Sequence, residues 1–173
     1  MAFSARMITK RKNLMNNSKP VFSAIAAGHM SIDMYPDLTE ITKEDFIRQF
    51  VPGRLVRVGP AVFSMGGSVS NTGLALNRFG VQTTYIAKIG QDYLGEIIQS
   101  ILKSVDENAL KNLIIDPNGA TSYSVIIHPK GMDRIFLHNP GANNTFVSDD
   151  ITPEMLRSAS LFHFGYPPLM EKM

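Results

Sequence analysis

Four residues in the first half of the chain combine polar chemistry with a freely approachable backbone. Asp33 follows a short apolar run that ends at Gly28, and the glycine pair Gly66 and Gly67 is followed by Asn71 in an apolar segment. An ionised carboxylate accepts hydrogen bonds from two neighbouring hydroxyls, each worth ~1.5–3 kcal/mol, and an amide side chain both donates and accepts. Because glycine has no β-carbon, a small hydroxylated molecule could rest on the peptide plane between these side chains.

Other functions of the segment GGSVSN, residues 66–71, have to be weighed against this one. A Walker phosphate loop requires a Gly-Lys-Ser/Thr triplet, which does not follow. A dinucleotide fingerprint belongs at the first strand-to-helix turn, and the turn after Gly28 has no such glycines. A strand-to-helix connection that needs only a positive φ stays open, as does an ordinary surface position for Asp33.

The apolar patterns around these residues predict alternating strands and helices. Residues 21–29 and 81–90 are typical of buried strands, and the apolar offsets over 94–105 predict a helix with Asp92 as its N-cap. The other expected elements are helices over 38–53 and 68–80, an edge strand near 55–62, a strand over 113–116, a hairpin over 121–138, a helix capped by Asp149 or Asp150 with Pro153 in its first turn, and a strand within 159–168. This order predicts an α/β, three-layer Rossmann-like fold with a mostly parallel sheet, from which the hairpin stands out as a flap.

The composition excludes several classes of protein. The 173 residues contain no cysteine, which rules out disulfides and cysteine nucleophiles and suits a cytoplasmic location. No apolar run reaches the ~18 residues of a membrane span.

Residues 1–19 hold five of the 17 basic residues and no acid, so the rest of the chain has 12 basic and 15 acidic residues. The basic KRK segment could indicate nucleic acid or a targeting peptide. We expect instead a disordered extension over 1–20, and no nucleic-acid binding, because the body has no basic stripe with interleaved aromatic residues.

Taken in order, several motifs resemble those of one family. They are Gly28 and Asp33 in GHMSID, then GGSVSNTGLALNRFG, then IGQDYLGE, then TSYSVII and FLHNPGANN of the hairpin and its exit. Over residues 21–166 the chain is similar to the N-terminal part of the ribokinase-like, or PfkB, carbohydrate kinases. The resemblance implies transfer of the γ-phosphoryl group of ATP, with Mg²⁺ and with a monovalent cation as a further candidate, to a sugar or polyol hydroxyl.

The resemblance also implies roles for individual residues. The implied acceptor-binding residues are Asp33, Gly66, Gly67 and Asn71, with Ser31, Ser68, Phe136 and Tyr166 as further candidates. The hairpin 121–138 and the strand near 55–62 would form a small β-lid over the sugar, and such a lid could also join two subunits as a homodimer. Asp92 is expected to be a helix cap, and His163 a core histidine. Ser68 stands where ribokinase has a lysine, so ribose is not specially favoured.

The resemblance stops before the catalytic aspartate of the family. That residue belongs to a Gly-Ala-Gly-Asp-like turn, which does not occur here, and the chain reaches Met173 just after a strand. We therefore expect a truncated chain in which residues 21–173 form the N-terminal part of a sugar-kinase domain, able to recognise the sugar but inactive alone. The alternative is a naturally short, non-catalytic sugar-binding or interaction module. A nucleotide-dependent oxidoreductase is disfavoured because the first turn lacks its glycines.

Overall fold

Strand β1, Ser23–Gly28, is the middle strand of the main sheet in the computed structural model, which describes residues 23–173. It lies between β4, Gln82–Ile86, and β9, Leu161–Gly165, and all three strands are parallel. All residues of β1 after the first are buried, as is typical of a parallel strand covered on both faces. We call these three strands the central sheet. The extension predicted over residues 1–20 lies outside the described residues.

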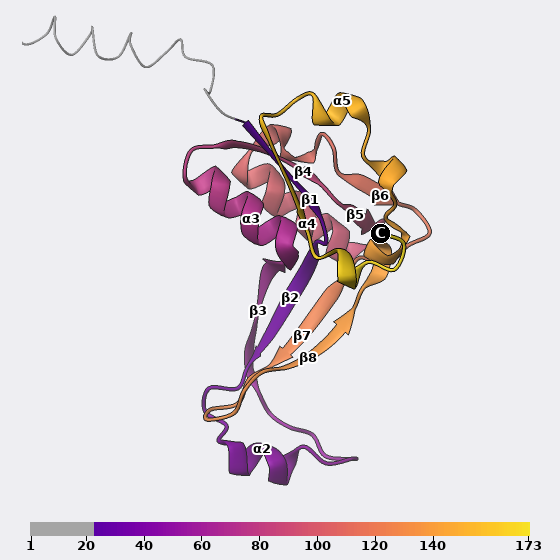
Figure 1. Cartoon of the computed structure of the whole chain (residues 1–173). Coiled ribbons are helices and arrows are strands. Elements are labelled where there is room, and N and C mark those ends of the chain that lie inside the picture. Colours follow the sequence, from indigo (N-terminus) through magenta and orange to yellow (C-terminus); the bar gives the residue numbers. More distant parts are fainter. Residues whose placement is uncertain (1–22) are drawn as a thin grey trace, which may run out of the picture.

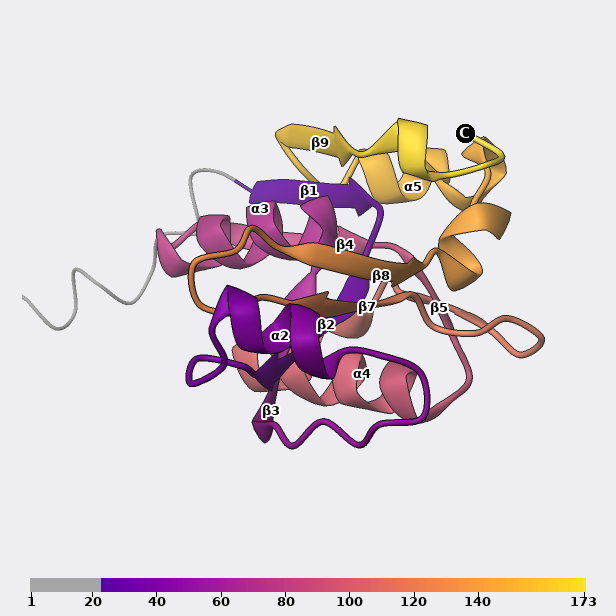
Figure 2. The same cartoon turned by 90° about the horizontal axis from the view of Figure 1, so that it is seen from below.

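Helices and turns cover both faces of the central sheet and make a three-layer α/β arrangement (Figure 1; Figure 2). The helices are α3 (Gly67–Arg78), α4 (Tyr93–Val105) and α5 (Pro153–Leu156), and the 3₁₀ turns are Glu107–Leu110, Gly141–Thr145, Ser148–Asp150 and Pro167–Leu169. Ala26 of β1 packs in a core with α3 and α4, whereas Ile25 and Ala27 pack on the other face with Phe146 and Met170. The alternation of β1 side chains therefore divides the interior into two cores.

The helix predicted over 94–105 is confirmed as α4. Its residues Ile98 and Leu102 are fully buried. Asp92 caps it, as predicted, by accepting a hydrogen bond from the backbone N–H of Gly95 (2.9 Å). The second carboxylate oxygen accepts from the backbone N–H of Thr121 (2.7 Å), so the same side chain also fixes the segment that leads into β7.

Among residues 23–173, no helix has the length and apolar character needed to cross a membrane.

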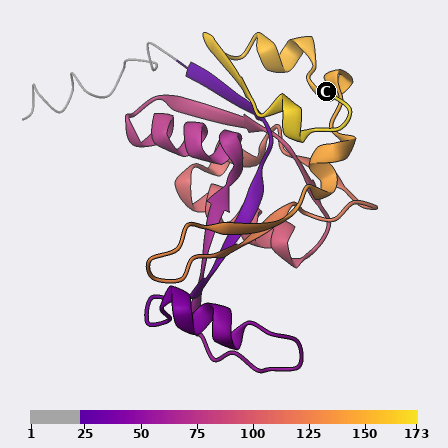
Figure 3. The same ribbon diagram turned by 60° about the horizontal axis from the view of Figure 1, so that its bottom comes forward.

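A second sheet, which we call the outer sheet, extends away from the central sheet (Figure 1). Its strands, in spatial order, are β3 (Gly59–Gly66), β2 (Ser31–Asp37), β7 (Tyr123–Ile127) and β8 (Ile135–Asn139). Strand β2 is antiparallel to β3 and parallel to β7, and β7 with β8 forms the predicted antiparallel hairpin. Helix α2, Lys43–Gln49, lies at the far end of this sheet (Figure 3), and the short strands β5 (Lys88–Gly90) and β6 (Ile114–Asp116) form a separate parallel pair.

Two predictions about helix boundaries are wrong. The helix expected over 38–53 is only the seven residues of α2, because the Thr42 side chain accepts from the backbone N–H of Asp45 and so fixes the N-terminus there. Helix α5 is capped by Thr152 and not by Asp149 or Asp150, which lie in the preceding 3₁₀ turn. In both cases a threonine hydroxyl is the cap, and the acidic residues nearby made the sequence pattern ambiguous.

The strands of the outer sheet also differ from the prediction. The edge strand expected near 55–62 begins at Gly59 and continues to Gly66, so Gly59-Pro60 opens the strand instead of interrupting it. Strand β2 was not predicted at all, since its last residues, Pro36 and Asp37, are poor strand formers. It forms because it is paired on both sides, to β3 and to β7.

Asn143 holds the turn between β1 and β2 in place. This fully buried side chain accepts from the backbone N–H of Met30 (3.2 Å) through Oδ1 and donates through Nδ2 to the carbonyl oxygens of Met30 (2.9 Å) and Pro140 (3.1 Å). The exit of the hairpin is thereby joined to the point where the chain passes from the central sheet to the outer sheet.

Replacing Asn143 with alanine is expected to lower the free energy of unfolding by about 2–4 kcal/mol, because the substitution leaves buried backbone groups without partners. Urea denaturation measures this loss. The matched control is Asn144→Ala, which truncates a less buried amide and should change stability by no more than about 0.5 kcal/mol. Equal effects of the two substitutions would contradict the role assigned to Asn143.

Candidate functional site

A cavity of about 610 Å³ lies where the two sheets meet, beyond the carboxyl end of β1 and beside the start of α3. Ligands of open α/β sheets bind at this end of the strands, and the volume is that of a small-molecule site. Six of the eight residues predicted for the acceptor site line the cavity: Ser31, Asp33, Gly67, Asn71, Phe136 and Tyr166. They come from β2, α3, β8 and the turn after β9, so chain segments distant in sequence build one site.

The glycine pair makes room for two polar side chains of the protein itself. A β-carbon on Gly66 would collide with the carboxylate of Asp33, and one on Gly67 would lie 2.5 Å from the carbonyl oxygen of His29 and 2.8 Å from its Nδ1. Gly67 also has a φ of +84°, which side-chain-bearing residues rarely adopt. The carboxylate of Asp33 and the groups of His29 are thus enough to require glycine at both positions, whether or not a ligand approaches the backbone there. Gly67 lines the cavity, whereas Gly66 does not.

Asp33 is a half-buried carboxylate on β2. It lies opposite Ser64 of β3 and beside Ser124 of β7, and the hydroxyl of Ser31 is 3.5 Å from its Oδ1. Burial raises the pKa of Asp33 above its ordinary value, although hydrogen bonds from Ser124 and Ser31 and the nearby His138 partly oppose this. A carboxylate that has lost part of its hydration gains most from new donors, so this group is well placed to accept ligand hydroxyls.

His29, which the sequence did not single out, lies in the turn between β1 and β2 and lines the same cavity. Its side chain is buried, and neither ring nitrogen has a hydrogen-bond partner among residues 23–173. The rings of His138 and Tyr166 lie 5.3 Å and 6.2 Å away, centre to centre. Burial, together with the charge of His138, lowers the pKa of His29 to about 4, so the imidazole is neutral at physiological pH.

This lowered pKa makes stability depend on pH. Between pH 6.5 and about 4 the unfolded chain binds a proton at His29 that the folded chain does not bind. Stability therefore falls as the pH falls through this window, by at most about 3 kcal/mol from this residue. Asp33 acts in the opposite sense, because its raised pKa makes the folded chain the better proton binder. We expect His29→Gln to remove part of the acid destabilisation, measured as the unfolding free energy at pH 7.5 and pH 5.

The control for this pH measurement is His128→Gln, which replaces an exposed histidine at the end of β7. This variant should keep the pH dependence of the wild-type chain. If the His29→Gln and wild-type curves run parallel from pH 7.5 to pH 5, His29 is not the group that is kept neutral by folding.

Besides Gly66, Ser68 and His163 also lie outside the cavity. The hydroxyl of Ser68 faces Gly165 and has no hydrogen-bond partner among the described residues, so Ser68 is not placed to contact a ligand there. The Nε2 atom of His163 lies 3.2 Å from the hydroxyl of Thr72, so the ring has a hydrogen-bond partner as expected, but His163 is only partly buried. Tyr166 does line the cavity and is the one non-glycine residue of 23–173 with a positive φ (62°), a strain that is typical of functional sites.

The outer sheet adds polar side chains that were not predicted as site residues from the sequence. They are Tyr35 on β2, Ser64 on β3, Ser124 on β7, Arg134 just before β8 and His138 on β8. Ser124 is register partner both of Asp33 and of His138, and its hydroxyl lies 3.0 Å from Nδ1 of His138. The alternation of side chains along each strand would have selected these residues once the strand pairing was known.

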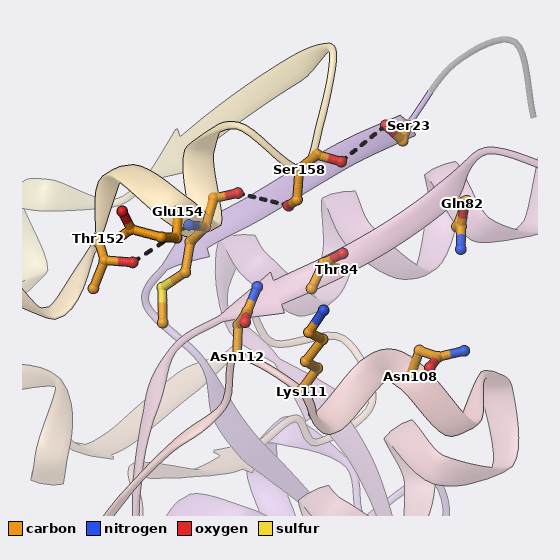
Figure 4. Close-up of a pocket in the computed structure, with 10 residues that line it drawn as sticks. Ser23, Gln82, Thr84, Asn108, Lys111, Asn112, Thr152, Glu154 and Ser158 are labelled. Carbon is orange, nitrogen blue, oxygen red and sulfur yellow. Dashed lines mark hydrogen bonds between the residues drawn. The ribbon is translucent and has the colours of Figure 1, made fainter.

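A second cavity, of about 640 Å³, lies at the opposite end of the central sheet, where β1 and β4 begin. Figure 4 shows Lys111 and Asn112 on one side of it, with Thr84 of β4 close to Lys111, and Thr152 and Glu154 on the other side. Some of its lining residues bond to one another; the hydroxyl of Ser23, for example, donates to the carbonyl oxygen of Ser158 (3.4 Å). Among the described residues, no buried side chain without a partner lines this second cavity.

In the described part of the chain, no group of three or more histidine, aspartate or glutamate side chains could hold a metal ion. The residues of the first cavity instead suit a neutral molecule with several hydroxyls.

The parallel central sheet, its two helical layers and the outer sheet define a ribokinase-like α/β fold. The sequence model of the pfkB family of carbohydrate kinases matches residues 23–169. This chain therefore belongs to the pfkB carbohydrate kinase family, as the motifs predicted.

Curated relatives and solved structures agree with this assignment. Fructokinase-2 of Oryza sativa subsp. japonica is 24% identical over 143 residues, which cover 82% of this chain and 39% of the relative. Probable fructokinase-3 of Arabidopsis thaliana is 26% identical over 145 residues, covering 82% and 38%. This chain thus spans about 40% of the length of these relatives.

Two solved structures show the same fold. Ribokinase from Cryptococcus neoformans var. grubii serotype A in complex with ADP has a TM-score of 0.61 at 21% identity, covering 83% of this chain and 42% of that one. Fructokinase with bound ATP from Xylella fastidiosa has a TM-score of 0.62 at 16% identity, with the same two coverages. At this level of identity the likeness concerns the fold alone.

Proposed function

We propose that this chain is the acceptor-binding part of an ATP-dependent carbohydrate kinase. The observation that carries the proposal is the half-buried carboxylate of Asp33, held beside the glycine turn in a cavity between the two sheets. Membership of the pfkB family supports a sugar or polyol as the ligand, and so do the fructokinase names of the relatives. The particular sugar is one that offers two adjacent hydroxyls to this carboxylate.

The residues of the cavity have complementary roles in this proposal. Asp33 accepts hydrogen bonds from two hydroxyls and so orients the acceptor, and Asn71 of α3 offers an amide that both donates and accepts. Phe136 and Tyr166 supply apolar surface against the sugar ring. The outer sheet is the lid, whose closure keeps water away from the acceptor hydroxyl, so that phosphate is not lost to solvent.

ATP supplies the phosphoryl group in carbohydrate kinases, and we propose that its site, Mg²⁺ and the catalytic aspartate belong to residues other than 23–173. On this view the 173-residue chain binds the sugar and does not phosphorylate it. The cysteine-free sequence fits a cytoplasmic location, where ATP is available.

Isothermal titration calorimetry of the 173-residue chain tests this function. The ligands are D-fructose, D-ribose, sorbitol and adenosine, and a coupled assay for ADP release runs in parallel with ATP and Mg²⁺. We expect saturable binding of at least one ligand and no ADP release above that of the buffer. A folded, monodisperse chain that binds none of the four would contradict the proposal, and so would turnover by the chain alone.

The alternative, an interaction module, is favoured by one observation on the back of the outer sheet. Phe63, Met34, Val125 and Leu137 are successive register partners across all four strands, so they lie on one face, away from Asp33. Phe63 and Leu137, at the two edges of this row, are 45% and 53% exposed. We propose that the row pairs with that of a second copy, so that the lid also forms a homodimer.

Light scattering after gel filtration distinguishes the two states of the chain. The monomer mass is 19.1 kDa, and the homodimer would have twice that mass. We expect a dimer for the wild-type chain and a monomer for Leu137→Asp. The control is Val105→Asp, since Val105 is an exposed apolar residue at the end of α4, outside this row. A wild-type monomer at high micromolar concentration would contradict the dimer without bearing on sugar binding.

A further inference from the structure

We propose that His29 determines which acceptor the site takes, by hydrogen-bonding one hydroxyl or the ring oxygen of the sugar through an imidazole nitrogen. The inference rests on the proposed function, because it adds a second anchoring side chain to the cavity that contains Asp33. Asp33 is presented by the outer sheet, whereas His29 belongs to the turn that leaves the central sheet. The two side chains would therefore hydrogen-bond to different parts of one ligand molecule.

The backbone around His29 is fixed on two sides. Its N–H donates to the carbonyl oxygen of Gly165 after β9 (3.3 Å), and its carbonyl oxygen accepts from the N–H of Val69 in α3 (3.1 Å). The ring lies against Gly67, where a β-carbon would be 2.8 Å from Nδ1. Each member of the glycine pair thus accommodates one polar residue of the cavity, since Gly66 makes room for Asp33 and Gly67 for His29.

Within the part of the chain that the structure describes, the ring nitrogens of His29 have no hydrogen-bond partner. A neutral imidazole has one donor and one acceptor, and buried polar atoms are nearly always satisfied in native proteins. The other buried side chains without a partner among residues 23–173 are Ser68, Ser70 and Tyr85, and none of them lines this cavity. His29, which is 3% exposed, is therefore the one such group placed to receive a ligand there.

The groups that cover His29 are also at the cavity. The ring of Tyr166 lies edge-on to the imidazole, and that of His138 lies tilted beside it. Tyr166 has the left-handed backbone described above, which costs energy and is typical of residues that contact ligands or change position. His138 belongs to the outer sheet and keeps its Nδ1 in the bond with Ser124. A sugar that enters between these two rings reaches the imidazole of His29.

The charge state of His29 also favours a sugar as the ligand of the cavity. His29 is held neutral by its burial. The other titratable groups around the cavity are His138, Tyr166, Tyr35 and Asp33, and Arg134 is its permanent cation. A neutral imidazole both gives and takes a hydrogen bond, as a hydroxyl does, so it suits an uncharged sugar. We infer that removal of the one hydroxyl that faces His29 weakens binding selectively.

Calorimetry with deoxy sugars tests the assignment. The tighter binder of D-fructose and D-ribose is compared with each of its monodeoxy analogues, for the wild-type chain, His29→Leu, His29→Gln and the control His128→Leu. We expect one analogue to bind the wild-type chain about tenfold more weakly than the parent sugar. His29→Leu should bind the parent about tenfold more weakly and no longer discriminate against that analogue. His29→Gln should recover part of the discrimination, and His128→Leu should match the wild-type chain.

A spectroscopic measurement on the wild-type chain does not depend on any variant folding. The ¹⁵N shifts of the imidazole rings are recorded without and with a saturating concentration of the same sugar. We expect one ring nitrogen of His29 to shift, while the rings of His128 and His163, which lie outside the cavity, keep their shifts. Unchanged His29 shifts at saturation would overturn the inference, and so would a uniform loss of affinity for all analogues in His29→Leu.

Failure of this inference can be told from failure of the proposed function. Suppose that the wild-type chain binds a sugar and that Asp33→Asn abolishes this binding. If the His29 variants then keep the wild-type discrimination and the ¹⁵N shifts of His29 do not change, only the role of His29 is wrong. If the wild-type chain binds no sugar or polyol at all, both proposals fail together.

Discussion

Replacing Asp33 with asparagine is expected to weaken sugar binding about 100-fold or more. The substitution keeps the shape of the side chain, which lies over Gly66, but replaces a carboxylate that accepts two charge-assisted hydrogen bonds by a neutral amide. Such bonds are worth ~1.5–3 kcal/mol each, and a loss of about 3 kcal/mol corresponds to about 100-fold in affinity. Calorimetry with the tightest-binding sugar measures the effect.

The same substitution is expected to leave stability unchanged or slightly higher at neutral pH. Because the pKa of Asp33 is raised by folding, the unfolded chain releases this proton more readily than the folded chain, so the ionised group lowers stability above its pKa. Asparagine removes that cost. A control on the same strand is Asp37→Asn, which changes an exposed carboxylate outside the cavity and should preserve binding. Lost binding together with lost stability in Asp33→Asn would indicate a structural role instead.

Gly67→Ala is expected to be the most destabilising single substitution at the site, at about 3–5 kcal/mol. Two effects add: a side chain at a φ of +84° costs ~1–2 kcal/mol, and the new methyl group would collide with the backbone carbonyl and ring of His29. The collision cannot be relieved by a rotamer change alone, because the carbonyl oxygen is fixed by its bond to Val69. Urea denaturation at pH 7.5 measures the loss.

Gly80→Ala is the matched control for this substitution. Gly80 has nearly the same φ, +81°, but a β-carbon there would meet no atom within 4 Å. Its replacement should cost only the ~1–2 kcal/mol of the strained backbone. The difference between the two variants therefore isolates the packing of His29 against Gly67. Equal costs would show that the ring of His29 is not held where the structure has it.

The helices and the hairpin could be predicted because their signals are local. The apolar offsets that lead to Ile98 and Leu102, with Asp92 before them, are enough to specify α4 and its N-terminus. The alternation of β7 and β8 around a proline-glycine turn is a similar local signal. The α/β order of these elements then limits the fold to a mostly parallel sheet with helices on both faces.

Strand β2 and the position of His29 could not be predicted, because both depend on contacts between segments that are distant in sequence. Pro36 and Asp37 argue against a strand, and only pairing to β3 and β7 makes β2 one. The glycine pair could be selected from the sequence, but its packing against Asp33 and His29 could not. No pattern around His29 separates it from a structural histidine such as His163, because its position in the cavity follows from where the two sheets meet.

A two-dimensional NMR titration of the ¹⁵N-labelled chain with D-fructose, D-ribose, sorbitol and adenosine tests the acceptor site directly. We expect the ligand that binds to shift the backbone amides of Asp33, Gly67 and Asn71, around the cavity between the sheets. The amides of Lys111 and Glu154, at the second cavity, should stay unchanged. Shifts confined to the second cavity, or no shifts with any of the four ligands, would contradict the claim that Asp33 and the glycine turn hold a hydroxylated acceptor.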